Sequence, residues 1–222
     1  MTRGLNILIS AGPTHEAIDP VRFIGNRSSG KMGLALAKAF ADLGHQVQFI
    51  TGPLTIPIES HPNIHRTKVE SAQDMYNAIV PFQKNYDIGI MTAAVADFTP
   101  VNVSDQKIKK TANQSEMSIQ LKKTIDILAY LGQHKNNNQT LVGFCLETEN
   151  ESENARRKLT AKKCDLIVLN SLRDENAGFG FDSNKVTVFD VNGVEFDLPT
   201  MSKTELGRIL CERVLQRHLG NQ

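Results

Sequence analysis

The stretch Asp19-Pro-Val-Arg-Phe-Ile-Gly-Asn-Arg-Ser-Ser-Gly-Lys-Met-Gly33 closes an unusually long connection between a predicted strand and a predicted helix. The strand is the apolar run from Leu5 to Ser10, and apolar residues recur at helical spacing from Met32 onward. Strand-to-helix connections in α/β proteins usually take about 2 to 6 residues, and much longer ones tend to be functional or disordered. Prolines and large apolar side chains in this loop disfavour disorder. We therefore predict a functional loop from Ala11 to about Gly30.

The end of this loop has the composition of an anion-binding site. Ser28 and Ser29 are good helix N-cap residues, and Gly30 would let a ligand approach the backbone. The N–H groups at a helix start attract phosphate or carboxylate oxygens. Asn26 and Lys31 add hydrogen-bond donors and a positive charge at the same place. The alternative is a capped helix that follows an ordered loop and binds no ligand.

Two nucleotide-binding motifs fit only in part. Gly25 to Lys31 matches the phosphate-loop pattern G-x-x-x-x-G-K, but Met32 stands where that motif requires Ser or Thr to hold magnesium. We therefore reject a phosphate loop of that type. A dinucleotide fingerprint G-x-G-x-x-G would follow the first strand directly, where Ala11-Gly-Pro-Thr14 supplies only one of the glycines. An NAD(P)-linked reductase is thus less favoured but stays open.

The overall charge gives no reason to expect a polyanionic partner. The chain of 222 residues carries 25 basic and 24 acidic side chains, so anion binding must come from local clusters. The N-terminus lacks an apolar segment of signal-peptide length, and no apolar run approaches the roughly 18 residues of a membrane span. We expect a cytoplasmic protein that binds neither nucleic acid nor a membrane.

The three cysteines, Cys145, Cys164 and Cys211, are widely spaced and form no metal-type pair. Cys145 and Cys164 lie in or at the entry of apolar strand patterns. We interpret all three as buried thiols, with a catalytic nucleophile as the less favoured alternative.

Strand patterns alternate with helical patterns along the chain, which is typical of a largely parallel sheet with helices on both faces. Strands are predicted at 5–10, 47–51, 64–69, from 87, at 117–121, 141–148, 165–170, 185–190 and 194–198, and helices after 32 and at 71–84, 124–134, 151–163 and 202–218. Asn192-Gly193 predicts a hairpin between the last two strands. We predict one domain over residues 1–222: an α/β, Rossmann-like, mostly parallel doubly wound sheet with a C-terminal β-hairpin.

Small residues follow the predicted strand that begins near Asp87. Ligands of open parallel sheets bind beyond the carboxyl ends of the strands, which places Ala93, Ala94 and Asp97 at the ligand edge. Small side chains allow a flat base or ribose to approach the backbone, and Asp97 could accept from a sugar hydroxyl or from a metal-bound water. Ordinary close packing, with Asp97 capping a turn, is the alternative.

Two groups of cations stand near this edge. The polar segment at about 99–116 contains Lys107-Ile-Lys-Lys110 and could act as a mobile flap that closes over a polyphosphate, or it is a solvated surface. Lys158 and Lys162 are one helical turn apart and could point together toward a phosphate. The alternative is that both simply complement the helix dipole.

Taken in order, these motifs resemble phosphopantothenoylcysteine synthetase, also called phosphopantothenate-cysteine ligase. The matching runs are Ala11-Gly-Pro-Thr14, Asp19-Pro-Val-Arg22, Asn26 with Ser28-Ser-Gly-Lys-Met-Gly33, Ala93-Ala-Val-Ala-Asp97, Lys107-Ile-Lys-Lys110, Val142-Gly-Phe144, Glu147-Thr148 and Asp165-Leu-Ile. In many bacteria this unit is fused behind a flavin-dependent decarboxylase. No segment of that kind is found here, so the resemblance implies a stand-alone form working with a separate phosphopantothenoylcysteine decarboxylase.

The resemblance implies a ligase of coenzyme A biosynthesis. The carboxylate of 4'-phosphopantothenate would attack the α-phosphate of CTP to give an acyl-cytidylate and pyrophosphate. The amine of L-cysteine would then release CMP and form 4'-phosphopantothenoylcysteine. Mg²⁺ is the expected metal, without assigned ligands, and a homodimer is the expected assembly. The alternative in another class is a non-catalytic nucleotide-binding regulator on the same sheet.

The resemblance also assigns roles to residues. Asn26 would handle the acyl-cytidylate, Arg22 would act in the cysteine-dependent step, and Lys107 would contact the triphosphate. The nucleotide would be bound by Met91, Thr92, Ala93, Asp97, Lys107, Ile125, Asp126, Ile127, Leu128, Phe144, Lys158 and Lys162, and the other substrate by Ser28, Ser29, Gly30 and Lys31. Two runs depart from the family: Thr124-Ile125-Asp126 stands for Asn-Pro-Asp, and Cys145-Leu146-Glu147 for Ala-Ala-Glu.

Overall fold

The computed structural model describes residues 4–109, 115–171, 181–193 and 195–220. In these ranges the chain forms an eight-stranded sheet with the order β12-β11-β10-β9-β6-β1-β4-β5. Its strands are β1 (Asn6–Ala11), β4 (Gln46–Thr51), β5 (Ile64–Lys68), β6 (Ile88–Met91), β9 (Thr140–Glu147), β10 (Leu166–Ser171), β11 (Ser183–Asp190) and β12 (Glu195–Ser202). Pairing is parallel from β5 across to β10 and antiparallel for β11 and β12. The predicted Rossmann-like fold and its C-terminal hairpin are confirmed.

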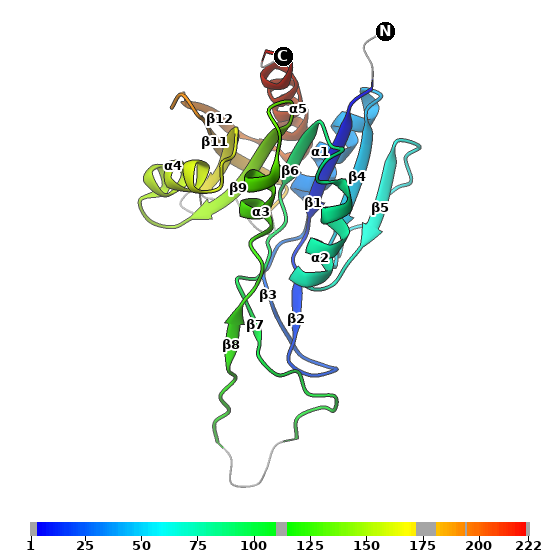
Figure 1. Ribbon diagram of the computed structural model, residues 1–222, viewed down its shortest axis with the longest axis vertical. Coiled ribbons are helices and arrows are strands. Elements are labelled where there is room, and N and C mark those ends of the chain that lie inside the picture. The colour runs from blue at the N-terminus through cyan, green and yellow to red at the C-terminus, as the bar shows by residue number, and fades with distance from the viewer. Residues whose placement is uncertain (1–3, 110–114, 172–180, 194, 221–222) are drawn as a thin grey trace.

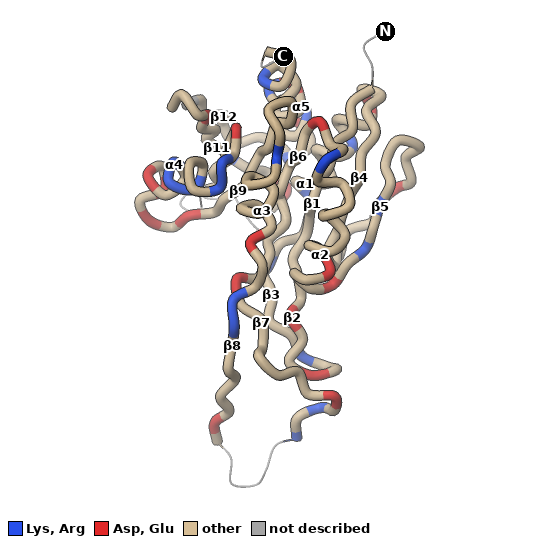
Figure 2. The backbone as a smooth tube through the Cα atoms, in the orientation of Figure 1, with Lys and Arg blue, Asp and Glu red and all other residues tan. Residues whose placement is uncertain are grey.

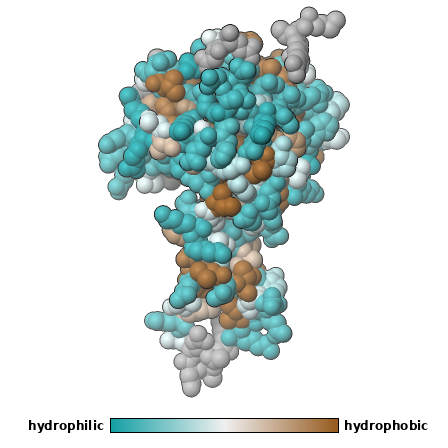
Figure 3. Space-filling view, in the orientation of Figure 1, coloured by the Kyte–Doolittle hydropathy of each residue, from teal (hydrophilic) through white to brown (hydrophobic). Residues whose placement is uncertain are grey.

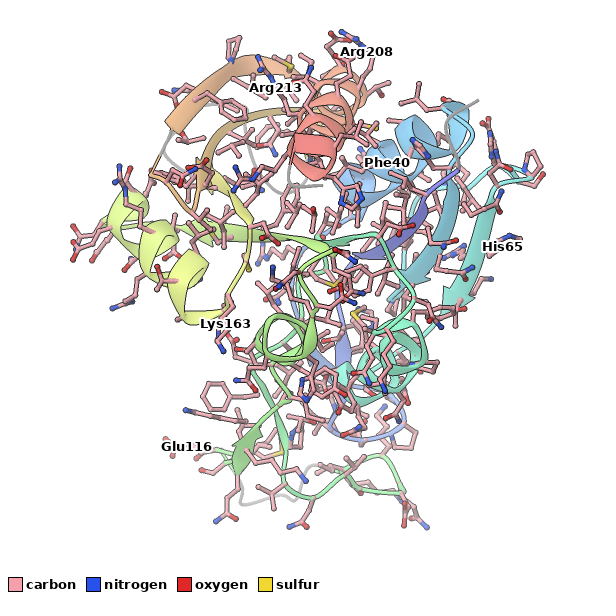
Figure 4. All side chains as sticks on the ribbon, turned by 45° about the horizontal axis from the view of Figure 1, so that its top comes forward. Phe40, His65, Glu116, Lys163, Arg208 and Arg213 are labelled. Carbon is pink, nitrogen blue, oxygen red and sulfur yellow. The ribbon has the colours of Figure 1, made fainter. Side chains whose placement is uncertain are left out.

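Helices cover both faces of the sheet (Figure 1). They are α1 (Lys31–Asp42), α2 (Ala72–Ile79), α3 (Ile127–His134), α4 (Glu151–Ala161) and α5 (Lys203–Gly220). Ile7 and Ile9 of β1 pack with α1 and α5, whereas Leu8 packs on the other face with α2, α3 and α4. Successive strand residues point to opposite faces, so a strand covered on both sides is apolar throughout. Phe40 of α1, labelled in Figure 4, is fully buried on the first face.

An arm extends away from the sheet (Figure 1). Its base is the antiparallel pair of β7 (Phe98–Pro100) and β8 (Leu121–Lys123). Beside it lies a hairpin of β2 (His15–Ala17) and β3 (Phe23–Gly25), which occupies the long loop before α1. The described residues of the predicted flap, 99–109 and 115–116, belong to the arm, whereas Lys110 of its basic motif lies outside the described residues.

Several predicted boundaries were wrong for local physical reasons. The loop before α1 contains the β2–β3 hairpin, which has too few residues to show a period. The strand predicted at 117–121 starts only at Leu121, which pairs with Pro100, the last residue of its partner β7. Beyond this pair the backbone N–H of Val101 still donates to the carbonyl oxygen of Gln120 at 2.9 Å. Helix α2 begins at the predicted capping box of Ser71 and Asp74 but ends at Ile79 in a 3₁₀ turn, η1 (Val80–Phe82), where Pro81 cannot continue the helix.

Charged residues of both signs are interspersed over the chain, as Figure 2 shows. No helix within the described ranges combines the length and the apolar content that a bilayer crossing requires.

Helix α1 packs unusually closely on the carboxyl ends of β1 and β6, and Gly33 makes this approach possible. A Cβ atom at Gly33 would lie 2.4 Å from Cβ of Ala11 and 2.6 Å from Oγ1 of Thr92. Both atoms belong to well-held groups, since Ala11 is fully buried and the Thr92 hydroxyl donates to the carbonyl oxygen of Ser10 at 2.7 Å. Helix α1 can therefore begin directly over this edge only with glycine at this position.

We predict that Gly33→Ala lowers the free energy of unfolding by about 1 to 3 kcal/mol, because the added methyl group overpacks this contact. Urea denaturation followed by circular dichroism measures the change. The matched control is Gly220→Ala, also in a helix but with open space around its Cβ, which we expect to be neutral or slightly stabilising. Equal stability of the two variants would contradict this account of how α1 is seated.

Candidate active site at the carboxyl edge of the sheet

Two adjoining clefts open where the parallel strands β1, β6, β9 and β10 end. The large cleft has a volume of about 550 Å³ and the small cleft a volume of about 120 Å³. They share a wall formed by Ala93, Ala94, Phe144, Cys145 and Leu146. The wall follows β6 and lies in β9, at the edge of the sheet where the rule for open parallel sheets placed Ala93 and Ala94.

The large cleft gathers most of the residues that were predicted to bind a nucleotide. Its lining includes Met91, Ala93, Asp97, Ile125, Asp126, Ile127, Leu128, Phe144, Lys158 and Lys162. Of the predicted set, Thr92 lines the small cleft instead, and Lys107 lines neither cleft. These residues come from four separate stretches of the chain, so only the fold brings them together.

Two cations that line the large cleft have carboxylate partners. Lys158 Nζ lies 2.6 Å from Oε1 of Glu147 at the end of β9, and Lys162 forms an ion pair with Asp126. Asp126 also caps α3, since its side chain accepts from the backbone N–H of Ala129 at 2.9 Å. Lys162 directly follows α4, so its ion pair joins the end of α4 to the start of α3 beside the cleft.

The small cleft holds the predicted anion-binding residues Ser28, Ser29, Gly30 and Lys31. Capping by Ser28 or Ser29 was a wrong prediction. Gly30 is the N-cap residue of α1 with φ of 75°, and no side chain caps this helix. A Cβ at Gly30 would lie 2.2 Å from Cδ2 of Leu54 and 3.3 Å from the backbone of Gly12, so the turn requires glycine. The first amide groups of α1 border the cleft without a side-chain acceptor from the cap.

Three lining residues of the small cleft were missed by sequence reasoning: Asn170, Asn184 and Lys203. The Asn184 side chain donates to Oδ1 of Asn170 at 2.8 Å, and Lys203 Nζ donates to the carbonyl oxygen of Phe181 at 2.6 Å. Burial lowers the pKa of Lys203 from its usual value. Asn170 ends a parallel strand and could have been found by the edge rule. Asn184 and Lys203 come from the C-terminal hairpin and from α5, whose approach to this edge has no sequence signal.

The three residues predicted to act in catalysis lie around the clefts rather than in their described linings. Asn26 Nδ2 donates to the carbonyl oxygens of Ala94 at 2.9 Å and of Val95 at 3.2 Å, so it is held against the shared wall. Lys107 is exposed on the arm. Arg22 is held by Asp19, and its Nη2 also donates to the carbonyl oxygen of Ile108 at 2.9 Å. The structure thus brings Arg22 next to the arm and leaves Asn26 at the wall.

Cys145 stands in the wall between the clefts but has the properties of a packed thiol. All three cysteines are unpaired and buried, as predicted. Burial raises the pKa of Cys145 to about 12, and it does the same for Cys164 and Cys211. The thiolate is the nucleophilic form, so these side chains are poorly suited to covalent catalysis near neutral pH.

Comparison with known proteins identifies the family. The family model described as "DNA/pantothenate metabolism flavoprotein C-terminal domain" matches residues 2–218. The chain belongs to this family. A curated relative from an unknown prokaryotic organism, named "Cysteine/Cysteine sulfinic acid decarboxylase", is 48% identical over 96% of this chain and 58% of its own length. The "Coenzyme A biosynthesis bifunctional protein CoaBC" of Bacillus subtilis (strain 168) is 47% identical over 95% of this chain and 51% of its own length.

Two solved structures have the same fold. The crystal structure of the C-terminal domain of the coenzyme A biosynthesis bifunctional protein CoaBC has a TM-score of 0.80 at 38% identity, covering 99% of this chain and 100% of that domain. A structure described as "Cab2 mutant H337A complex with phosphopantothenate-cysteine" has a TM-score of 0.77 at 18% identity over 98% of this chain and 87% of its own. The chain spans about half the length of the curated relatives it matches, and along almost its whole length it is similar to the C-terminal domain of the bifunctional protein.

We predict that the native protein resists alkylation of all three cysteines by iodoacetamide at pH 8, because the thiols are buried and almost wholly protonated. Mass spectrometry after a short incubation should show the unmodified chain, and the same reaction in concentrated urea should label every cysteine. The unfolded sample is the control for reagent activity. Rapid labelling of Cys145 in the native protein would show that it is an accessible and reactive thiol.

Proposed function

We propose that this chain joins 4'-phosphopantothenate to L-cysteine and uses CTP to activate the acid. This activity is supported by membership of the family and by the 38% sequence identity to the C-terminal domain of a coenzyme A biosynthesis protein. The phosphopantothenate-cysteine bound to the Cab2 variant, which shares the fold, supports it as well. The observation that carries the proposal is the shared wall: a cleft with the predicted nucleotide residues adjoins a cleft with the predicted substrate residues.

The arrangement suits a reaction in which both nucleophiles come from substrates. In the first step an oxygen of the substrate carboxylate bonds to the α-phosphorus of CTP, and the bond from that phosphorus to pyrophosphate breaks. In the second step the cysteine amine attacks the acyl carbon, loses a proton, and CMP departs with the electron pair of the broken C–O bond. The protein then needs to align reactants and neutralise charge, and it needs no reactive thiol or hydroxyl of its own.

Each group of residues has a task in this scheme. Lys158 and Lys162 would face the phosphates from the large cleft, exchanging Glu147 and Asp126 for phosphate oxygens as the nucleotide enters. Amide groups at the start of α1, with Lys31, would hold an anionic group in the small cleft. Asn26 would stand between the two reactants, because its amide is anchored to the wall at Ala94.

The donor set fits a magnesium ion that is held mainly by the triphosphate. No three His, Cys, Asp or Glu side chains gather into a metal site among the residues that the structure describes. Asp97 presents a carboxylate to the large cleft, and Mg²⁺ is commonly bound by one or two carboxylates together with substrate phosphates. When bound, the ion would neutralise negative charge on the phosphate oxygens.

The direct test is to incubate the pure protein with 4'-phosphopantothenate, L-cysteine, magnesium chloride and either CTP or ATP. We expect pyrophosphate release and a ligated product identified by mass spectrometry, with CTP as the preferred nucleotide. Omitting cysteine is the control and should prevent formation of the ligated product. Failure to form that product with any nucleotide would reject the ligase, and binding of CTP without turnover would favour the regulator.

We predict that Asn26→Asp reduces kcat roughly 100-fold, since a carboxylate in place of the amide loses the donor and faces two carbonyl oxygens. Steady-state kinetics measure the effect, and the melting temperature checks that the fold is kept. The control is Asn138→Asp, an exposed position in the turn before β9. If Asn26→Asp turned over at the normal rate, Asn26 would have no part in the mechanism.

We also propose that two copies of this chain associate through the arm. Figure 3 shows brown, apolar surface on the lower part of the molecule. The exposed apolar side chains of the arm and the adjacent hairpin are Val21, Phe23, Phe98, Val101, Val103, Met117 and Leu121. A groove of about 640 Å³ runs between the hairpin and the arm. Arg22 lies in the turn between β2 and β3 and Lys107 lies on the arm, and neither lines a cleft of its own chain. In a dimer, both could contribute to a cleft of the second copy.

We predict that Val103→Asp produces a monomer, because it places a charge on the apolar surface of the arm, while the wild type sediments as a dimer. Sedimentation velocity at several protein concentrations distinguishes the two. The control is Val191→Asp, which is similarly exposed but lies in the turn between β11 and β12. A wild type that is monomeric at every concentration would refute the proposed assembly.

A further inference from the structure

Asp19 is a buried carboxylate in the loop that precedes α1, and it is surrounded by donors. Its side chain is fully buried, beside a guanidinium group from Arg22. Oδ1 accepts from the backbone N–H groups of Val21 and Arg22, both at 2.9 Å. Oδ2 accepts from Nε of Arg22 at 3.0 Å and from the backbone N–H of Ile108 at 3.1 Å. The hydrogen bond from the Arg22 side chain is the main reason that the pKa of Asp19 is well below its usual range.

The same pair of side chains holds both polar backbone groups of Ile108. Asp19 accepts from its N–H, and Arg22 Nη2 donates to its carbonyl oxygen at 2.9 Å. A nearby backbone bond from the N–H of Ser104 to the carbonyl oxygen of Ile18, at 3.0 Å, joins the same two segments. The arm is thus attached to the loop before α1 at a second place, beyond the β7–β8 pair at its base.

Ile108 lies between Lys107 and Lys109, and both lysines are exposed. Fixing the backbone of Ile108 therefore fixes the backbone positions from which the two lysine side chains extend. The side chains themselves stay accessible to a ligand. Arg22 is held by the same carboxylate and keeps about 40% of its side chain exposed. The buried charge of Asp19 therefore orients cations from two segments that are far apart in the sequence, Arg22 in one and Lys107 in the other.

This contact lies outside the two hydrophobic clusters that hold the sheet and its helices together. A buried ion pair is weak evidence of a stabilising role, because desolvation offsets much of the attraction. The Asp19 carboxylate instead accepts five hydrogen bonds, from Nε and Nη2 of Arg22 and from three backbone N–H groups, and two of these N–H groups belong to its own turn. These bonds define its geometry. Loss of the charge should release this junction locally and leave the body of the protein folded.

We infer that Asp19 is a positioning residue for the ligation reaction: it fixes Arg22 and the Lys107 segment of the arm as one unit. The inference rests on the proposed function, and it assigns a role to a residue that does not itself touch a substrate. Cations that are already placed when charge develops on the phosphate need no reorganisation at that moment.

The test uses Asp19→Asn in the full chain. The amide can still accept from Val21 and Arg22 through its oxygen, but its nitrogen cannot accept from Ile108, and the charge that holds the guanidinium is lost. We expect hydrogen exchange at the Ile108 amide, followed by NMR, to become at least about 10-fold faster, with amides of β1 unchanged. We expect kcat to fall by a similar factor with a melting temperature close to that of the wild type. Asp105→Asn, an exposed carboxylate on the same arm, is the control and should change neither quantity.

A second variant separates positioning from a merely local structural role. Arg22→Lys keeps a positive charge but cannot hold Asp19 and Ile108 together, and combining it with Asp19→Asn should cost much less than the product of the single effects. The inference would be overturned if the double variant lowered kcat by the product of the two single effects. It would also be overturned if Asp19→Asn made exchange at the Ile108 amide faster and left kcat unchanged. A fall in kcat of Asp19→Asn without faster exchange at the Ile108 amide would overturn it as well. If the wild type forms no ligated product, the proposed function fails, whereas the exchange measurement still reports whether Asp19 holds the arm.

Discussion

The close approach of α1 to the carboxyl ends of β1 and β6 is the constraint on which the rest of the site depends. Gly33 removes the side chain that would keep the helix away from Ala11 and Thr92, and Gly30 forms the left-handed turn that starts the helix there. With α1 in this position, its first amides border the small cleft. The long connection before α1 must then pass around the edge of the sheet, which places the β2–β3 hairpin beside the arm.

Because α1 begins at this place, the carboxyl edge of the sheet is divided into two clefts that share one wall. The wall residues at Ala93 and Ala94 are small, so groups on either side can approach each other closely, and Phe144 gives the wall one large flat side chain. Cations border both clefts, but most are held by carboxylates before any ligand binds, as Lys158 is by Glu147 and Lys31 by Asp182. These ion pairs hold flexible lysine side chains at the rim of the clefts. Because each ion pair is partly exposed, breaking it when a ligand binds costs only a modest free energy.

Sequence reasoning succeeded where the signal was local. The capping box at Ser71, the hairpin at Asn192-Gly193 and the small residues after β6 each depend on a few neighbouring residues, and each was located correctly. It failed where a position depends on distant parts of the chain. The contact of Arg22 with Ile108 spans 86 residues, and Lys203 reaches the small cleft because the start of α5 is held beside Phe181 and Asp182. The residues predicted to bind a nucleotide were assigned through resemblance to a family, since no periodicity unites their four segments.

The measurement that bears most directly on the central claim is a crystal structure with CTP and 4'-phosphopantothenate bound. The account predicts that the two ligands contact the shared wall from its two sides, with the α-phosphate near Ala93 and Ala94 and within reach of the substrate carboxylate. A nucleotide bound away from both clefts, or a substrate acid separated from the α-phosphate by the body of the protein, would contradict it.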